Sequence, residues 1–321
     1  MSQEQTGRQE NVTLGVIVIV LTVFAMSVAD AIVKYVSADF PLWQIYVVRS
    51  ILVIPMLAAI ALFGRQPVRI GPKARGWTLL RSMLLAFMYI AIYAAVPVLS
   101  LSVIAAALYT GPLFIALFSA VMIGEPVGLR RWAAIVIGFA GVMVILRPAA
   151  EGFSYLALIP IVAAILYALA AVITRAKCQD EPPMVLAFAL NFSLLAVGIV
   201  ATGAIALWHP SEAQSGFYPF LLGYWVAMGP REWGIIAALA VLMMAISTGL
   251  AKAYQSAPPA VIATFDYSYM LFAAFWSFAV FSQTPDAMTI VGMLMIAGAG
   301  FLVMQRPGAS RAVPSQQQPA Q

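Results

Sequence analysis

One acidic residue, Asp266, stands in the middle of a long apolar stretch, 261–267. A carboxylate inside such a segment is costly unless it meets a partner, and it suits the binding of a cationic group or the carriage of a proton. It equally suits a packing role in which an arginine neutralises it. The stretch 103–109 has the same first three residues and the same final tyrosine, but Leu108 stands where the second copy has the acid. The broken symmetry makes Asp266 the first candidate for a ligand-binding residue.

Further ionisable side chains fall inside apolar segments, and Arg49, Asp30 and Lys34 each have two interpretations. Arg49 suits a carboxylate or phosphate of a ligand, since its guanidinium is a planar fork, and it suits Asp266 equally well as a structural pair. Asn191 holds the repeat position that corresponds to Arg49. Asp30 and Lys34 are four residues apart, the spacing of an ion pair within one helix. Asp30 is the deeper of the two and a candidate for a cavity wall, whereas Lys34 is a gate-proximal or structural residue.

Aromatic residues gather around the repeated stretch. Their rings can stack on a planar ligand or hold a cation, although most aromatics in a helix bundle serve packing. Tyr109 and Tyr267 are the preferred candidates because they hold equivalent places in the two copies. The aromatic candidates are Tyr93, Tyr109, Phe265, Tyr267, Tyr269 and Trp276.

Other residues are candidates for hinges or for helix ends. Pro112 and the pair Pro258 and Pro259 loosen helices beside the proposed site, either as hinges or as cavity-lining breaks. Glu125 is expected to end a helix with an interfacial salt bridge. Arg81 lies one turn inside its helix and is expected to extend to the membrane surface.

Composition determines the environment of these residues. Of 321 residues, 63% are hydrophobic and 9% are charged, which indicates a polytopic helical membrane protein. The first apolar stretch is expected to be a retained helix rather than a signal peptide. One cysteine and one histidine exclude a disulfide framework and a multi-Cys or multi-His metal site, and no cofactor is predicted.

Ten membrane spans of about 20 residues fit the apolar stretches. The expected spans are about 12–36, 41–63, 78–98, 101–123, 130–147, 153–175, 183–208, 233–255, 258–282 and 287–305. The connection after 208 is expected to lie along the outer interface. The predicted fold class is therefore an all-α membrane protein with ten transmembrane helices.

The basic residues orient these spans. With the N-terminus cytoplasmic, twelve Lys and Arg residues fall on the cytoplasmic side and two, Arg147 and Arg231, fall outside. Both termini are thus expected in the cytoplasm. The net charge of +5 follows from this bias, so no nucleic-acid partner is predicted. The predicted location is the bacterial inner membrane, as a multi-pass protein in contact with the lipid bilayer.

The chain divides into two five-helix units, which defines the predicted domains. They are a cytoplasmic tail at 1–11, a first repeat at 12–148, a second repeat at 149–307, and a disordered tail at 308–321. Because five is odd, the second repeat enters the membrane from the opposite side. Inverted repeats of this kind are common in alternating-access transporters, with the substrate near the midplane, and they also occur in some channels.

Several motifs resemble one known family. They are Asp30-Ala31-Ile32-Val33-Lys34-Tyr35, Pro41-Leu42-Trp43-Gln44, Arg49-Ser50, Gly111-Pro112, Gly124-Glu125-Pro126 and Phe265-Asp266-Tyr267. Together they resemble the EamA branch of the drug/metabolite transporter superfamily, closest to riboflavin and S-adenosylmethionine carriers. The resemblance implies ten helices, a central cavity and transport of a small organic metabolite. The second half departs from the family pattern at 282–285, where Ser-Gln-Thr-Pro replaces the usual Gly-Glu.

The predicted function is secondary active transport of a zwitterionic or cationic metabolite, amino-acid- or nucleoside-derived, by alternating access. The alternative is an uncoupled facilitator or a channel for a small solute. The chain lacks a P-loop, an aspartyl-protease signature and a histidine placed to serve a nucleophile, so an enzyme is not expected. Protons are a candidate coupling ion, and the protein is expected to be a monomer or a homodimer. The substrate, the direction of transport and the oligomeric state do not follow from the sequence.

Overall fold

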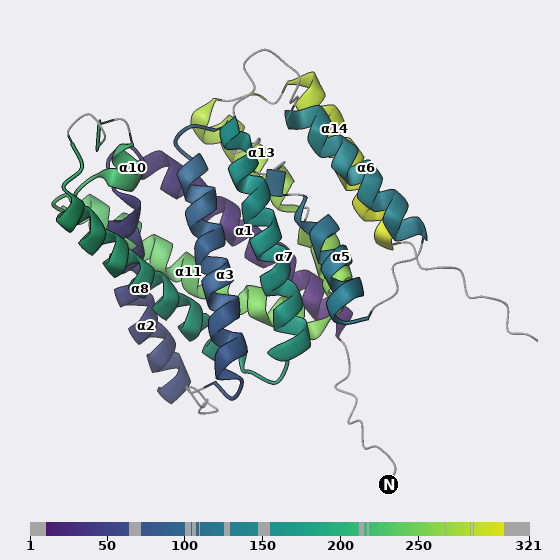
Figure 1. The fold of residues 1–321 in the computed structure, drawn as a ribbon, viewed down its shortest axis with the longest axis horizontal. Coiled ribbons are helices and arrows are strands. Elements are labelled where there is room, and N and C mark those ends of the chain that lie inside the picture. Colours follow the sequence, from purple (N-terminus) through teal and green to yellow (C-terminus); the bar gives the residue numbers. More distant parts are fainter. Residues whose placement is uncertain are drawn as a thin grey trace, which may run out of the picture.

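The computed structural model describes residues 11–63, 72–99, 104, 107–108, 110–124, 129–146, 155–211, 215–216, 218–266, 268–282, 284 and 286–304. Within these ranges every regular element is a helix (Figure 1). The helices of the first half are α1 (Val12–Val36), α2 (Leu42–Phe63), α3 (Arg75–Ala95), α5 (Gly111–Met122) and α6 (Leu129–Leu146).

The second half begins with a short 3-10 helix, η1 (Tyr155–Leu158). It continues with α7 (Ile159–Lys177), α8 (Pro183–Trp208), α10 (Pro219–Leu222), α11 (Pro230–Ser256), α12 (Pro259–Asp266), α13 (Ser268–Phe281) and α14 (Ala287–Met304). The span expected at 258–282 contains α12 and α13, which the structure describes on either side of position 267, and Val261–Phe281 counts as one span long enough to cross a membrane. Seven of the spans in the described part of the chain are long and apolar enough to cross a membrane.

Local sequence accounts for where several helices begin. The side chain of Asn11 accepts a hydrogen bond from the backbone N–H of Leu14 at 2.9 Å and so caps α1. Proline stands in the first turn of α5, α7, α8 and α11, where its missing N–H costs nothing. The carboxylate of Glu232 reaches back to the N–H of Gly229 at 2.7 Å and caps α11.

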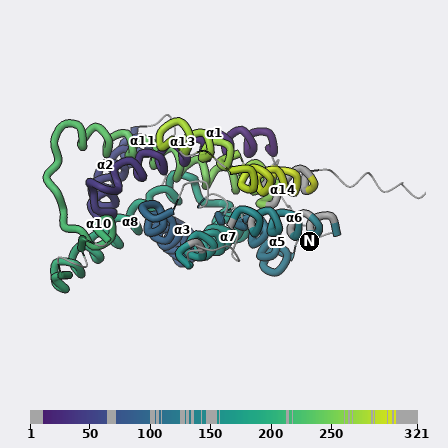
Figure 2. Tube along the Cα trace, turned by 90° about the horizontal axis from the view of Figure 1, so that it is seen from above, coloured from purple at the N-terminus to yellow at the C-terminus, as the bar shows by residue number. Residues whose placement is uncertain are grey.

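Each main packing contact joins a helix of the first half to one of the second. The contacts pair α1 with α11, α3 with α7, α2 with α8, and α6 with α14. In Figure 2, α11, α1 and α13 lie along one side of the molecule and α3, α7 and α5 along the other. Side chains such as Ile19, Leu57 and Leu85 are buried inside the bundle. Buried surface within the bundle therefore comes mainly from pairs of helices that are distant in sequence.

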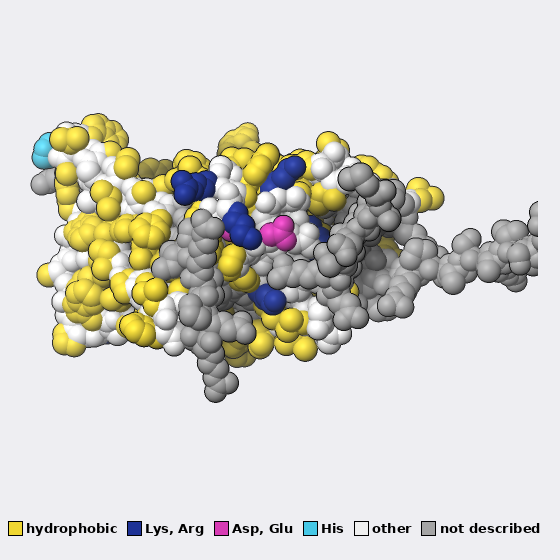
Figure 3. Space-filling model, turned by 90° about the horizontal axis from the view of Figure 1, so that it is seen from below, with side chains coloured by type: hydrophobic (Ala, Val, Ile, Leu, Met, Phe, Trp, Pro, Cys, Tyr) yellow, Lys and Arg dark blue, Asp and Glu magenta, His cyan; other side chains and the backbone are white. Residues whose placement is uncertain are grey.

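The outer surface of the bundle is apolar, as a lipid-facing surface must be. Leu21, Val200 and Leu271 are each exposed by 64% or more. Lys and Arg side chains gather on one end of the molecule, where α3 begins and α7 ends (Figure 3). Residues there include Lys73, Arg75, Arg175, Lys177 and Lys252. The chain is a multi-pass membrane protein.

Candidate functional site

A small cavity lies among α1, α3, α5, α7, α12 and α13, and two carboxylates face it. Asp30 of α1 and Asp266 of α12 both line it, with Tyr89, Tyr167 and Tyr269. The remaining described lining residues are Met26, Met88, Ile92, Leu108 and Pro112. The cavity volume is about 40 Å³, which is room for water but not for a metabolite. Both acids belong to the predicted site, and the fold brings them together from opposite ends of the chain.

Asp30 is held by two tyrosines from two other helices. The hydroxyl of Tyr269 donates to Oδ2 of Asp30 at 2.6 Å, and that of Tyr93 donates to Oδ1 at 3.2 Å. The side chain of Asp30 is 7% exposed. Hydroxyl donors reduce the cost of burying a carboxylate, because each replaces a water molecule that the acid loses. The predicted candidates Asp30, Tyr93 and Tyr269 therefore form one hydrogen-bonded group.

Asp266 is held in a similar way by tyrosines of the second half. The hydroxyl of Tyr167 donates to Oδ2 of Asp266 at 2.7 Å, and that of Tyr254 donates to Tyr167 at 3.2 Å. Neither Tyr167 nor Tyr254 is among the residues predicted from the sequence. The internal repeat offered a signal for Tyr254. Tyr93 and Tyr254 stand on α3 and α11, the third long helices of the two halves, so Tyr254 is a repeat counterpart of the predicted residue Tyr93.

Two opposed carboxylates with tyrosine donors can do two things chemically. They can bind a positively charged group placed between them, because carboxylates accept hydrogen bonds and attract cations. They can also take up protons when that group leaves, since two negative charges in a buried site repel each other. Neither role needs a metal, and the described residues contain no cluster of His, Cys, Asp or Glu that would hold one.

Arg49 does not pair with Asp266, so one of the two roles predicted for Arg49 is not observed. Asp266 accepts its hydrogen bond from Tyr167, whereas the guanidinium of Arg49 lies over the ring of Tyr46, 5.3 Å from its centroid. Arg49 is 1% exposed, and its Nε and Nη2 have no hydrogen-bond partner among the described residues. Its repeat counterpart Asn191 donates to the backbone of its own helix. Neither residue is among the described ones that line the cavity.

The predicted ion pair between Asp30 and Lys34 does not form either. The ammonium of Lys34 donates to the backbone carbonyl of Leu99 at 2.9 Å and lies over the ring of Phe281. Asp30 turns instead toward the tyrosines. The two residues share a face of α1 but lie one turn apart along its axis, so they meet different neighbours. Asp30 is level with the tyrosine hydroxyls, whereas Lys34, nearer the end of α1, reaches the carbonyl of Leu99.

Arg81 corrects the expectation that it extends to the membrane surface. It is 1% exposed, and its Nε donates to the hydroxyl of Thr174 on α7 at 2.6 Å. The close contact between α3 and α7 encloses the guanidinium, although Arg81 lies near the start of its helix. The burial of Arg81 depends on the packing of α7 against α3, which the position of Arg81 along α3 does not predict.

The remaining candidates fall outside the cavity or outside the described residues. Trp276 donates to the hydroxyl of Ser27 at 3.2 Å and lines a separate groove on α1, and Phe265 is half-buried. Pro258 and Pro259 stand at the beginning of α12, where Pro258 accepts the first backbone hydrogen bonds, so they start a helix rather than interrupt one. Tyr109, Tyr267 and Glu125 lie outside the described residues.

Comparison with known proteins points to transport. The EamA-like transporter family matches residues 13–147. The pseudopaline exporter of Pseudomonas aeruginosa PAO1 is 25% identical over 89% of this chain and 94% of its own length. The riboflavin transporter of Vibrio cholerae is 27% identical over 85% of this chain and 86% of its own. The S-adenosylmethionine uptake transporter of Rickettsia prowazekii is 23% identical over 60% of this chain and 59% of its own.

A solved crystal structure supports the fold. It superposes with a TM-score of 0.64 at 17% identity and covers 91% of this chain and 96% of that one. The family match, the relatives and the apolar helices agree with the motifs found in the sequence. They confirm the predicted resemblance: residues 13–147 are an EamA-like domain, and the chain resembles the small-molecule transporters of the EamA branch of the drug/metabolite transporter superfamily.

Proposed function

We propose that the protein is a secondary active transporter that moves a small cationic or zwitterionic metabolite across the bacterial inner membrane by alternating access. The observation that carries the proposal is the pair of buried carboxylates, Asp30 and Asp266, on one cavity. Buried acids in a membrane bundle are costly, and such residues usually mark a substrate or ion pathway. In this structure the cavity is too small for a substrate, and the tyrosine partners hold both acids toward it.

The pattern of helix contacts supports two inverted five-helix halves. If α1, α2 and α3 correspond to α7, α8 and α11, then the α1–α11 contact corresponds to the α7–α3 contact. The α2–α8 contact then corresponds to itself, as does the α6–α14 contact. Such exchange is expected of two repeats related by a two-fold axis in the membrane plane. The proposed motion is a rocking of the halves about the cavity that they share.

Two loop attachments support the same relation. The side chain of Gln44, at the start of α2, exchanges two hydrogen bonds with the backbone of Val226, in the segment between α8 and α11. The carboxylate of Glu181, just before α8, accepts a hydrogen bond from the N–H of Ala74, in the segment between α2 and α3. Each half thus holds the corresponding loop of the other, and the two attachments lie at opposite ends of the bundle.

The relatives narrow the substrate when the cavity is considered with them. Their names give pseudopaline, riboflavin and S-adenosylmethionine as transported molecules. Two carboxylates favour a positively charged ligand, and S-adenosylmethionine carries a sulfonium and an ammonium, whereas riboflavin is uncharged. We therefore propose a positively charged substrate, with tyrosine rings available to pack on an aromatic part of it.

Transport in proteoliposomes tests the proposal directly. Radiolabelled S-adenosylmethionine is the first probe and riboflavin the comparison. Asp266→Asn and Asp30→Asn should each reduce uptake by at least about tenfold, because each removes a charged contact worth about 1.5–3 kcal/mol. Asp180→Asn, an exposed acid after α7, is the matched control. Wild-type rates in well-folded Asp266→Asn and Asp30→Asn proteins would remove the acids from the mechanism.

Counterflow separates a carrier from a channel or an uncoupled facilitator. Saturable exchange of external label for internal unlabelled substrate requires a site that alternates between the two sides. An imposed pH gradient then tests coupling to protons: accumulation that follows the gradient supports it, and accumulation that ignores the gradient indicates facilitation or exchange.

A further inference from the structure

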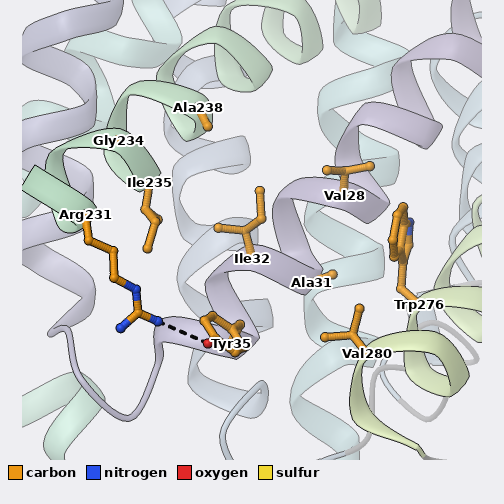
Figure 4. Close-up of a pocket in the computed structure, with 10 residues that line it drawn as sticks. All are labelled: Val28, Ala31, Ile32, Tyr35, Arg231, Gly234, Ile235, Ala238, Trp276 and Val280. Carbon is orange, nitrogen blue, oxygen red and sulfur yellow. Dashed lines mark hydrogen bonds between the residues drawn. The ribbon is translucent and has the colours of Figure 1, made fainter.

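A second hollow lies on the opposite face of α1 from the central cavity. It is a groove of about 440 Å³ between α11 and α13, with α1 as its floor (Figure 4). The groove is lined by Val28, Ala31, Ile32, Tyr35, Arg231, Gly234, Ile235, Ala238, Trp276 and Val280. All of these side chains except that of Arg231 are apolar or aromatic. The proposed transport site makes no use of this groove.

The helix geometry separates the groove from the carboxylates. At about 100° per residue, the α1 side chains of the groove point about 100–160° away from Asp30. Asp30 faces the central cavity, and therefore the groove faces outward, away from the protein interior. Tyr35 at 55% and Val280 at 44% exposure confirm that the groove opens on the molecular surface. In a multi-pass membrane protein that surface meets lipid.

A single positive charge stands at one end of the groove. The guanidinium of Arg231, an exposed residue, donates to the hydroxyl of Tyr35 at 3.0 Å and lies over its ring (Figure 4). That hydrogen bond uses one of the five donors of the guanidinium. Arg231 also lies in the first turn of α11, where backbone N–H groups favour an anion. The neighbouring carboxylate of Glu232 is directed back to the N–H of Gly229.

Aromatic side chains place this end of the groove at the level of the lipid headgroups. Trp233 beside Arg231 is 49% exposed, and Trp225 in the preceding segment is 46% exposed. Exposed Trp and Tyr residues concentrate where the bilayer meets water. From Arg231 the groove follows α11 inward to Ala238, a rise of about 10 Å at 1.5 Å per residue. An apolar channel of that length below a cation matches a phosphate with the upper part of an acyl chain.

We propose that this groove binds one glycerophospholipid of the surrounding bilayer, with its phosphate on Arg231 and an acyl chain between α11 and α13. The apolar walls alone do not select a lipid, since an acyl chain leaves an equally apolar environment in the bilayer. Selection comes from the charge-assisted hydrogen bonds to the phosphate and from the fit of the chain against Trp276 and Ile32. Anionic phospholipids gain most, because their headgroup adds no ammonium to compete for the phosphate.

Two matched glycine variants test the acyl-chain part. A Cβ at Gly234 would meet nothing within 4 Å, so a side chain can start there without a clash, and Gly234→Leu should extend into the groove that Gly234 lines. Gly203 on α8 is equally open, exposed and helical, but it lies outside the groove. Purified protein is titrated with phosphatidylglycerol in detergent, and bound lipid is counted by native mass spectrometry. Gly234→Leu should lose the tightest-bound lipid, and Gly203→Leu should retain it.

Arg231→Gln tests the headgroup part. It should weaken phosphatidylglycerol binding by about five- to tenfold, the loss of a charge-assisted contact, and remove any preference over phosphatidylcholine. Equal lipid retention in Gly234→Leu and Gly203→Leu would overturn the proposal. A change from dimer to monomer in Gly234→Leu would overturn it too, by showing that a second copy of the chain fills the groove. If Gly234→Leu does not fold, Ala238→Phe fills the same groove and gives the same readout.

Discussion

The hydroxyl of Tyr269 on α13 lies 2.6 Å from Oδ2 of Asp30 on α1 and donates a hydrogen bond to it. The bond crosses from the second half of the chain to the first and holds an acid at the cavity. An alternating-access motion that moves the two halves apart must break this bond or carry both residues together. In the proposed mechanism, a substrate cation that approaches Asp30 would compete for the same oxygen. The Tyr269–Asp30 pair would then connect substrate binding to the contact between the halves.

Removing the Tyr269 hydroxyl should cost stability. Tyr269→Phe leaves the acid with one donor fewer, and we expect a loss of about 1–3 kcal/mol in stability. The matched control is Tyr46→Phe, because the buried hydroxyl of Tyr46 has no partner among the described residues and its removal should be neutral or stabilising. Thermal unfolding of both variants in detergent measures the difference. Equal melting temperatures would show that the hydrogen bond contributes nothing.

Loss of the Gln44 side chain should free the segment before α11. Gln44 donates to the carbonyl of Val226 at 2.8 Å and accepts from its N–H at 2.9 Å, with a side chain that is 2% exposed. In Gln44→Met both backbone groups lose their partner, so hydrogen exchange at Val226 should accelerate by about tenfold or more. Thr202→Val removes an exposed hydrogen bond to Trp225 in the same segment and should change exchange much less. Comparable exchange in the two variants would contradict the anchoring role.

Close packing of α1 on α11 depends on Gly249. A Cβ at this position would overlap the hydroxyl of Thr22, so Gly249→Ala should destabilise the protein by about 1–3 kcal/mol. Gly203→Ala, at an open helical position, should instead stabilise it slightly, because alanine favours the helix. Melting temperatures give both effects. Adding Thr22→Ala should rescue Gly249→Ala, and absence of rescue would mean that the predicted overlap is not the cause.

The single cysteine should be inert in the folded protein. Cys178, just after α7, is fully buried, and burial raises the pKa of its thiol. Less thiolate at neutral pH and no access for a reagent both slow alkylation. Maleimide labelling at pH 7.5 should therefore be slow until the protein unfolds. Asp180→Cys, made in a Cys178→Ala background, carries an exposed thiol two residues along and should label at once. Rapid labelling of native Cys178 would contradict the packing at this end of α7.

The sequence by itself determined the helices and the environment of the chain. Apolar stretches of about 20 residues with few charges indicate membrane helices, because a lipid environment forces the backbone to satisfy its own hydrogen bonds. Expected and observed boundaries of α1 and α8 coincide, at Val12–Val36 and Pro183–Trp208. The cost of a buried acid likewise identified Asp30 and Asp266 without any contact being known. Each of these conclusions depends on a residue and its neighbours along the chain.

Only the tertiary structure decided which side chains meet. Arg49 was one of the partners considered for Asp266, but Asp266 meets Tyr167. Arg81 was expected at the surface, but it is enclosed against Thr174. These partners stand on helices about 90 or more residues apart, and a rotation of any helix by one residue, about 100°, would replace them with others. Helix rotation and pairing follow from the packing of the whole bundle. The sequence therefore identifies which groups require a partner, and the tertiary structure determines which partner each group has.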